Sequence, residues 1–164
     1  MAHIPPYDHP DVVAGQGTIG LELLDEAAFD ICCTPIGGGG LSSGLCLALA
    51  GRVPVHGVEP ADADDARRSL QSGALSSNAA PSRSACDGLR NTRVGDLNFA
   101  ILRERLAGIV TVTEPEVEAA CRAIADAGFG PVEPSGAAAT AAVLAGRVGV
   151  DGQTVVAIVS GGNV

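Results

Sequence analysis

Four consecutive glycines, Gly37–Gly40, stand between a strand pattern and a helix pattern, and this junction constrains the fold more than any other feature of the chain. The residues before it, 29–36 (FDICCTPI), are apolar and partly β-branched, which predicts a buried strand. The residues after it, 41–50, have the pattern of a helix. Because glycine loses the most conformational freedom on folding, this run indicates either a close approach to the backbone or a turn that side chains forbid.

Strand and helix patterns alternate along the rest of the chain. Strands are expected at 29–36, 53–58, 108–113 and 154–160, and helices at 15–27, 41–50, 63–71, 97–106, 134–145 and from 113 onward. We expect Thr18 to cap the first helix, and Thr113 with Glu116 to form a capping box. Residues 73–94 show no period and predict a long functional or mobile loop. The order predicts an α/β fold, an open, mostly parallel sheet with helices on both faces.

Composition limits the class of protein. The chain has 164 residues, of which 46% are hydrophobic, as expected for one globular domain. A formal charge of −9 gives no basis for a nucleic-acid or anionic-membrane partner. No apolar run reaches the roughly 18 residues of a membrane span, and the first residues lack the pattern of a signal peptide. We therefore expect a cytoplasmic protein with no membrane partner.

Cysteines, histidines and serines give no sign of a metal centre or a hydrolase. The five cysteines include no C-x-x-C pair and are expected to be free, mostly buried thiols. The histidines, at positions 3, 9 and 56, are scattered and are interpreted as hydrogen-bonded rather than catalytic groups. Ser42 and Ser43 have no visible histidine and acid partners, so a serine nucleophile is not predicted.

The glycine junction predicts an anion site, because a turn between a strand and a helix gathers backbone N–H groups at the positive end of the helix dipole. The ATP-binding pattern G-x-x-x-x-G-K-[ST] requires a lysine, and all ten basic residues of this chain are arginines. The dinucleotide pattern is incomplete, since Ser42 stands where its third glycine belongs. The spacing thus favours a phosphate monoester. A second glycine-rich tip, 160–163 (SGGN), follows the last predicted strand at the same edge of the sheet.

Four carboxylates, Glu59, Asp62, Asp64 and Asp65, fall within seven residues after the second predicted strand. Acidic residues in a first helical turn complement the helix dipole without any ligand. Oxygen ligands at this density also suit Mg²⁺, Mn²⁺ or Ca²⁺. The residues alone leave both interpretations open.

Several motifs in register resemble one enzyme family. They are AGQGTIGLE (14–22), PIGGGGLSSG (35–44), GVEP (57–60) with ADD (63–65), DGLR (87–90), VEPSGA (132–137) and SGGNV (160–164). This series resembles the serine/threonine dehydratases and serine racemases, which are pyridoxal-phosphate enzymes of the tryptophan-synthase-β fold type. The resemblance extends from about Tyr7 to the last residue.

The resemblance implies roles for particular residues. It assigns the cofactor phosphate to Gly37, Gly38, Gly39 and Gly40 with the backbone of Leu41, and the pyridine nitrogen to Ser160. Where the family binds a divalent cation (Mg, Mn or Ca), the matching ligands are Glu59, the carbonyl of Ala63 and Asp65. Gly88 and Glu133 are expected to border the pocket.

The chain also departs from the family. The family's N-terminal half carries the Schiff-base lysine, a serine for proton transfer and an asparagine loop that holds the substrate carboxylate, and no counterpart of that half is present. We therefore expect a single partial domain, 1–164, which is the C-terminal part of the large domain of a threonine/serine dehydratase and is inactive alone. The alternatives are a non-catalytic phosphate- or cofactor-binding module or subunit, and part of a serine racemase. An exposed sheet edge and homo-oligomers are also expected.

Overall fold

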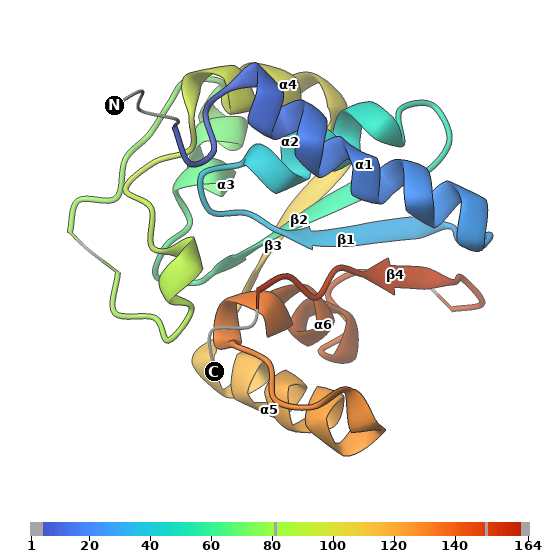
Figure 1. The fold of residues 1–164 in the computed structure, drawn as a ribbon. Coiled ribbons are helices and arrows are strands. Elements are labelled where there is room, and N and C mark those ends of the chain that lie inside the picture. The colour runs from blue at the N-terminus through green and yellow to red at the C-terminus, as the bar shows by residue number, and fades with distance from the viewer. Residues whose placement is uncertain (1–4, 81, 150, 162–164) are drawn as a thin grey trace, which may run out of the picture.

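The computed structural model describes residues 5–80, 82–149 and 151–161, which form a parallel sheet covered by helices (Figure 1). Four strands pair in the order β3-β2-β1-β4, and every pairing is parallel. The strands are β1 (Ile31–Pro35), β2 (Val55–Pro60), β3 (Gly108–Val112) and β4 (Val155–Ala157). The helices are α1 (Pro10–Glu26), α2 (Gly40–Ala48), α3 (Asp65–Ser72), α4 (Asp96–Arg105), α5 (Glu114–Ile124) and α6 (Pro134–Leu144), with short turns η1 (Asp87–Leu89) and η2 (Ala125–Phe129).

Helices cover both faces of the sheet, as the sequence predicts. Successive side chains of a strand point to opposite faces. Cys32 accordingly packs with α2 and α4, whereas Cys33 packs with α5 and α6. Figure 1 shows α1, α2 and α4 on one side of β1, and α5 and α6 on the other. The predicted α/β class and sheet type are therefore confirmed.

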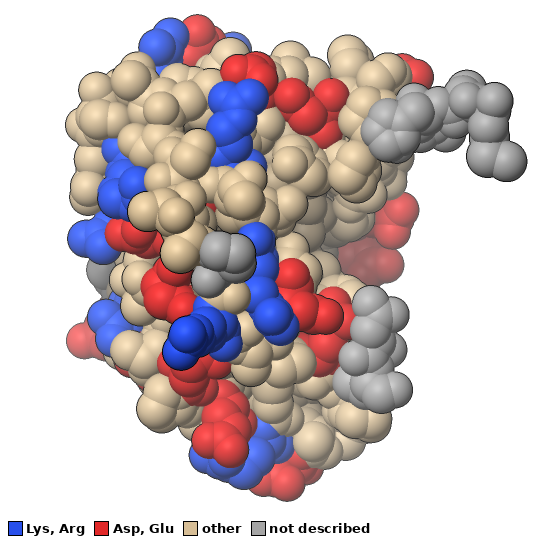
Figure 2. Space-filling model, turned by 90° about the vertical axis from the view of Figure 1, so that its left-hand side faces the viewer, with Lys and Arg blue, Asp and Glu red and all other residues tan. Residues whose placement is uncertain are grey.

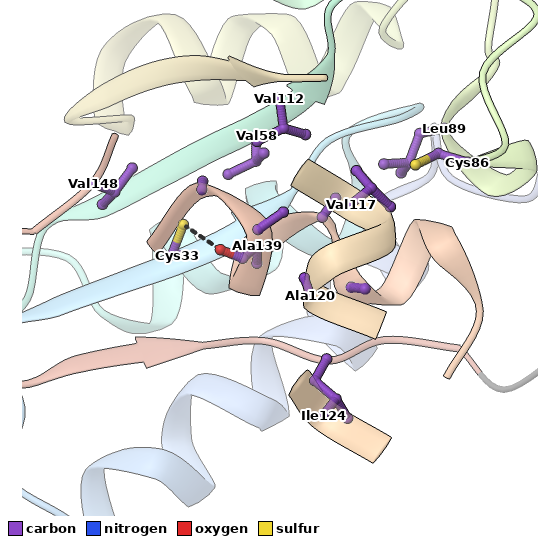
Figure 3. Packing of buried hydrophobic residues seen from close by; sticks show 14 of the residues in the cluster. Cys33, Val58, Cys86, Leu89, Val112, Val117, Ala120, Ile124, Ala139 and Val148 are labelled. Atoms are coloured by element: carbon purple, nitrogen blue, oxygen red, sulfur yellow. Dashed lines mark hydrogen bonds between the residues drawn. The ribbon is translucent and has the colours of Figure 1, made fainter. Parts of the chain in front are cut away.

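Small residues let α6 lie close to the sheet. Ala137, Ala138 and Ala139 are fully buried and belong to the core between this helix, α5 and the strands. In Figure 3, the Cys33 thiol of β1 points at α6, where it donates to the Ala139 carbonyl at 3.7 Å. Burial raises the pKa of the Cys33 thiol to about 12, so this group stays protonated. All five cysteines are free and four are buried, as predicted.

The first helix begins earlier than the sequence pattern predicts. Helix α1 begins at Pro10, and the ring nitrogen of His9 accepts the Asp11 N–H at 3.2 Å. Proline suits the first turn of a helix because it has no N–H to satisfy there. The expected cap at Thr18 is wrong: this residue lies inside the helix and donates to the Gly15 carbonyl at 2.9 Å.

Glycines in α1 explain why the start of this helix is hard to read from the sequence. A Cβ at Gly44 of α2 would lie 2.5 Å from the backbone nitrogen of Gly17 and 2.6 Å from the Val13 carbonyl oxygen. Helices α1 and α2 therefore cross with their backbones in contact. Glycine weakens an isolated helix, but here it permits the crossing that holds α1 on the molecule.

Strand β2 extends two residues beyond the predicted strand, and it includes Glu59. This carboxylate is only 1% exposed. Because a buried charged residue is uncommon unless it is paired, the apolar pattern used to predict the strand stopped before Glu59. By contrast, the capping box of α5 is confirmed, since the Thr113 N–H donates to Glu116 Oε2 at 2.7 Å.

Among the described ranges, no helix combines the length and the apolar character that crossing a bilayer requires. The described histidines are not clustered: His9 lies at the start of α1, and His56 lies within β2. Burial lowers the pKa of His56. His3 lies outside the described residues.

The order of the strands fixes where a ligand can bind. From β1 the chain adds β2 and then β3 on one side, and it returns to place β4 on the other side of β1. In open α/β sheets, ligands bind at the carboxyl ends of the strands where the winding direction reverses. Here that point lies between the ends of β1 and β4, which lead into Gly37–Gly40 and Ser160.

Candidate cofactor-binding site

A cavity of about 340 Å³ lies at this reversal point. Its volume is within the range of small-molecule sites. The residues that line it come from both glycine tips, from the loop before α4 and from the start of the described chain: Pro6, Tyr7, Pro35, Gly37, Gly38, Gly39, Gly40, Leu41, Ser42, Gly88, Leu89, Asn91 and Ser160. The structure thus brings together every residue assigned to the cofactor, with Gly88 beside them.

Each glycine of the loop is crowded by a neighbouring segment. A Cβ at Gly38 would overlap the Tyr7 ring, and one at Gly37 would lie 2.6 Å from Asn91 Oδ1. Gly39 adopts a φ of +93°, which side chains other than glycine's rarely adopt, and a Cβ there would lie 2.8 Å from Val94. Both explanations offered for the glycine run, close approach and an unusual turn, therefore apply.

The loop is held so that its peptide groups have a defined direction. The Gly38 carbonyl accepts from the Gly95 N–H at 3.1 Å and from Asn98 Nδ2 at 2.8 Å. Because C=O and N–H point in opposite directions across a trans peptide, the Gly39 N–H points away from α4. Asn98 is fully buried, and its Oδ1 has no hydrogen-bond partner among the described residues.

The first turn of α2 supplies further donors. The helix ladder starts with the Ser43 N–H, which donates to the Gly39 carbonyl at 2.9 Å. The N–H groups of Gly40, Leu41 and Ser42 precede it and have no acceptor within the helix. The Ser42 hydroxyl donates to the Pro35 carbonyl at 3.2 Å and closes the turn. None of the described lining residues carries a charged side chain, so the anion-binding potential that they give the cavity comes from N–H groups and the helix dipole.

Tyr7 and Asn91 are lining residues that the sequence did not assign. The Tyr7 carbonyl accepts from Asn98 Nδ2 at 3.1 Å, and Asp8 accepts the N–H groups of Asp96 and Leu97 at the start of α4. These bonds hold the ring of Tyr7 against the glycine loop. For Tyr7 the sequence offered one signal, that the family resemblance begins near this residue. For Asn91 it offered none.

Glu133 is not a lining residue of the cavity. It is 8% exposed and directly precedes α6, and a Cβ at Gly161 would overlap its carboxylate. Glu133 therefore lies behind the second glycine tip, against Gly161, which is the residue that follows Ser160. Gly88 does border the cavity, and its N–H donates to Asp87 Oδ1 at 2.8 Å and to Ser135 Oγ at 2.9 Å.

The four carboxylates after β2 separate into two kinds. Asp62 is exposed and accepts from Ser82 and the Arg83 N–H, and Asp64 accepts from Arg68 at 2.8 Å. Both are ordinary loop and helix-end contacts. Figure 2 views the side toward which the strands run, and it shows acidic and basic side chains interspersed there.

Glu59 and Asp65 form a buried carboxylate pair. The Glu59 oxygens accept the N–H groups of Ala66 and Arg67, each at 2.9 Å. Burial raises the pKa of Glu59 to about 8, those two hydrogen bonds oppose the rise, and the charge of Asp65 adds to it. Burial also raises the pKa of Asp65.

The oxygens of this pair allow a test of the proposed cation ligands. Asp65 Oδ1 accepts from Asn78, while Asp65 Oδ2 is buried with no hydrogen-bond partner among the described residues. An unpaired buried carboxylate oxygen next to a second carboxylate is a donor set that fits a divalent cation. Within the described ranges, no group of three or more His, Cys, Asp or Glu side chains is placed to hold a metal.

The chain is similar to enzymes that use pyridoxal phosphate. A family described as pyridoxal-phosphate dependent enzyme matches residues 1–161. L-threo-3-hydroxyaspartate ammonia-lyase of Saccharomyces cerevisiae is 40% identical over 168 residues, covering 100% of this chain and 51% of the yeast protein. Serine racemase of Dictyostelium discoideum is 39% identical, covering 98% of this chain and 52% of the racemase. The chain therefore spans about half the length of these curated relatives.

Solved structures support the same relationship. A threonine deaminase from T.th. superimposes with a TM-score of 0.90 at 43% identity, covering 96% of this chain and 59% of that one. Threonine deaminase isoform 2 from Solanum lycopersicum has a TM-score of 0.93 at 33% identity, covering 100% and 49%. These neighbours have the tryptophan-synthase-β type of fold. The family match over residues 1–161, and a fold shared with two threonine deaminases, show that this chain belongs to the pyridoxal-phosphate-dependent enzymes.

Proposed function

We propose that this chain is the C-terminal part of a pyridoxal-phosphate-dependent threonine/serine dehydratase. One observation carries the proposal: the glycine loop, the first turn of α2 and Ser160 line a single cavity. The complete enzyme removes the α-proton and the β-hydroxyl of a small hydroxy amino acid, and the resulting enamine hydrolyses to a 2-oxo acid and ammonia. When bound, pyridoxal phosphate supplies a ring that withdraws electrons from the substrate α-carbon.

The glycine loop is the proposed phosphate site. The N–H groups of Gly39, Gly40 and Leu41 donate to phosphate oxygens, while Gly37 and Gly38 complete the loop and leave room for Asn91 and the Tyr7 ring beside it. The Gly38 carbonyl is bound to α4 and so does not present an acceptor to the anion. Ser160, on the opposite tip, offers a neutral hydroxyl to the pyridine nitrogen. This partner is weaker than a carboxylate, which favours β-elimination over transamination.

The neighbouring residues have supporting roles in this proposal. Gly88 borders the cavity, and Glu133 packs behind the tip that carries Ser160. Glu59, Asp65 and the Ala63 carbonyl bind Mg²⁺, Mn²⁺ or Ca²⁺, which satisfies the unpaired Asp65 oxygen. The cation neutralises the carboxylate pair and has a structural role.

The chain alone is proposed to be inactive. A lysine amine must hold the cofactor covalently in such an enzyme, and this sequence contains no lysine. The half of each relative that this chain does not match is the proposed source of that lysine. We further propose that the complete enzyme is a cytoplasmic homo-oligomer.

The first experiment tests the cofactor site. We expect equilibrium dialysis to show that the chain binds pyridoxal phosphate and that inorganic phosphate competes. Gly39→Ala should abolish binding, because the new Cβ would lie 2.8 Å from Val94 and 2.9 Å from Asn98. Gly51→Ala is the matched control, since Gly51 also has a positive φ, +72°, but has no atom within 4 Å. Equal binding by both variants would place the cofactor elsewhere.

The second experiment separates the dehydratase from the alternatives. The chain is mixed with the unmatched half of the yeast ammonia-lyase, and 2-oxo acid and D-serine are measured from L-serine and L-threonine. Release of 2-oxo acid only in the mixture supports a dehydratase part, and D-serine as the main product supports a racemase part. Retained cofactor binding with neither product supports the non-catalytic module. Turnover by the chain alone would contradict the lysine argument.

A further inference from the structure

The side-chain amide of Asn78 connects the carboxylate pair to the wall of the glycine cavity. Its Nδ2 donates to Asp65 Oδ1 at 2.8 Å and to the Asn91 carbonyl at 3.2 Å. Its Oδ1 accepts from Arg68 Nη2 at 2.6 Å. If the amide of Asn78 were flipped, its oxygen would face two acceptors and its NH₂ group would face the donor groups of a guanidinium. These neighbours therefore fix the orientation of the amide.

Asn78 also fixes the position of the segment that borders the cavity. Its backbone N–H donates to the Thr92 carbonyl at 2.8 Å, next to the side-chain bond to Asn91. Asn91 lines the cavity, and its Oδ1 lies against Gly37, where a Cβ would be only 2.6 Å away. The segment around Asn91 is therefore held at two adjacent carbonyls by one residue of the long loop.

At its other end, Asn78 contacts a carboxylate that has an unsatisfied oxygen. Asp65 is 2% exposed, and its Oδ2 has no partner among the described residues. A cation bound at the pair would occupy this oxygen and further restrict the Asp65 side chain, whose Oδ1 already accepts from Asn78. The Asp65 oxygen that remains on Asn78 then holds the amide in the orientation that binds Asn91.

We propose that Asn78 is a positioning residue that couples cation binding at Glu59 and Asp65 to phosphate binding in the glycine cavity. The coupling is positive, because a fixed Asn78 holds Asn91 against Gly37 and keeps the cavity wall in place. It is also reciprocal, since two linked binding equilibria change each other's affinity by the same factor. This inference rests on the proposed function and adds a route between its two sites.

The test measures the Kd of pyridoxal phosphate with and without Mg²⁺. For the wild-type chain we expect Mg²⁺ to lower the Kd by about five-fold or more, and pyridoxal phosphate to lower the Kd of Mg²⁺ by the same factor. The Asn78→Ala chain should still bind each ligand, but neither ligand should change the Kd of the other, so that the ratio of the two Kd values is about one. Ser72→Ala is the matched control: it removes hydrogen bonds of a nearby hydroxyl to Ser69 and Ala74, none of which reaches the cavity, so it should keep the wild-type factor.

Hydrogen exchange of the wild-type chain provides a test that needs no variant. We expect Mg²⁺ to slow exchange at residues 88–92, and this result decides the question if Asn78→Ala fails to fold. Full coupling in Asn78→Ala, or no coupling and no protection in a wild-type chain that binds both ligands, would overturn this inference alone. Failure of the wild-type chain to bind pyridoxal phosphate would overturn the proposed function as well.

Discussion

Glu59 lies in an environment that disfavours its charged form. It lies in a strand of the sheet, is 1% exposed, and accepts two N–H groups at the start of α3. These bonds satisfy its oxygens but do not offset the loss of water around a charge, so burial raises its pKa from 4.5 to about 8. The Asp65 carboxylate beside it makes ionisation harder still.

This raised pKa predicts that the free energy of unfolding depends on pH. Between pH 4.5 and about 8 the unfolded chain loses the Glu59 proton while the folded chain retains it. Stability should therefore fall as pH rises through this window, by at most about 5 kcal/mol at 1.36 kcal/mol per unit. The proposed Mg²⁺ site requires the ionised pair, so Mg²⁺ should raise the melting temperature more at pH 8 than at pH 5. Calorimetry at the two pH values measures both effects.

Two variants check the cause of the Mg²⁺ effect. Asp65→Asn should lose it, because the unpaired oxygen becomes part of a neutral amide. Glu118→Gln should keep it, since Glu118 is an exposed residue of α5 whose described ion pair is with Arg122. An Asp65→Asn chain that responds to Mg²⁺ as the wild type does would contradict the ligand assignment.

At the scale of elements, the contact between α1 and α2 explains how the glycine loop is supported. Helix α2 begins at the loop, and α1 crosses it at Gly17 and Gly44 with backbone atoms in contact. Gly20 continues the contact, since a Cβ there would lie 2.8 Å from the Ala48 Cβ. The first turn of α2, which supplies the proposed phosphate donors, is therefore fixed by a helix that precedes it in the chain.

Alanine substitutions in the two helices should have opposite effects. Gly44→Ala places a Cβ 2.5 Å from backbone, which a rotamer change cannot relieve, so it should reduce the free energy of unfolding by about 1–3 kcal/mol. Gly15→Ala should increase it by about 0.5–1 kcal/mol, because Gly15 lies in α1 with no atom within 4 Å and alanine favours helix. Urea unfolding measures both, and a stabilised Gly44→Ala chain would show that the helices can separate freely.

For the molecule as a whole, the main feature is an apolar hollow beside β4. This strand is the last in the sheet order and pairs with β1 alone among the described strands. A hollow of about 710 Å³ lies next to it, lined by residues of α5, η2, α6 and β4. Three side chains beside it are well exposed: Phe129 by 83%, Leu144 by 61% and Val159 by 48%. Exposed apolar surface next to an edge strand favours association.

We predict that the chain self-associates through this hollow. In sedimentation velocity the wild type should form dimers or larger species, and the double variant Phe129→Ser, Leu144→Gln should shift toward monomer. Leu21→Gln is the control, since Leu21 is a comparably exposed leucine, 55%, on α1 and away from the hollow. A wild-type chain that stays monomeric at high concentration would contradict the prediction, and an equal shift with Leu21→Gln would place the contact elsewhere.

The amino-acid sequence alone was enough to predict the class of fold, which the structure confirms, and it predicts an anion site at the glycine tip. Alternating strand and helix patterns predicted the parallel sheet, and the capping box placed the start of α5, because these signals depend on neighbours in the chain. The lack of lysine is likewise a property of the sequence. The start of α1 was missed, since glycines that permit a helix crossing look like breaks in a helix.

Which distant residues meet could be learned only from the assembled fold. The order β3-β2-β1-β4 puts Ser160 beside Gly37–Gly40, and no local pattern reports strand order. The burial of Glu59, the contact of Tyr7 with Gly38, and the bonds of Asn78 to Asp65 and Asn91 also join segments far apart in the chain. The physical reason is that propensity and capping act within a few residues, whereas burial and hydrogen bonding between segments exist only once the sheet has assembled.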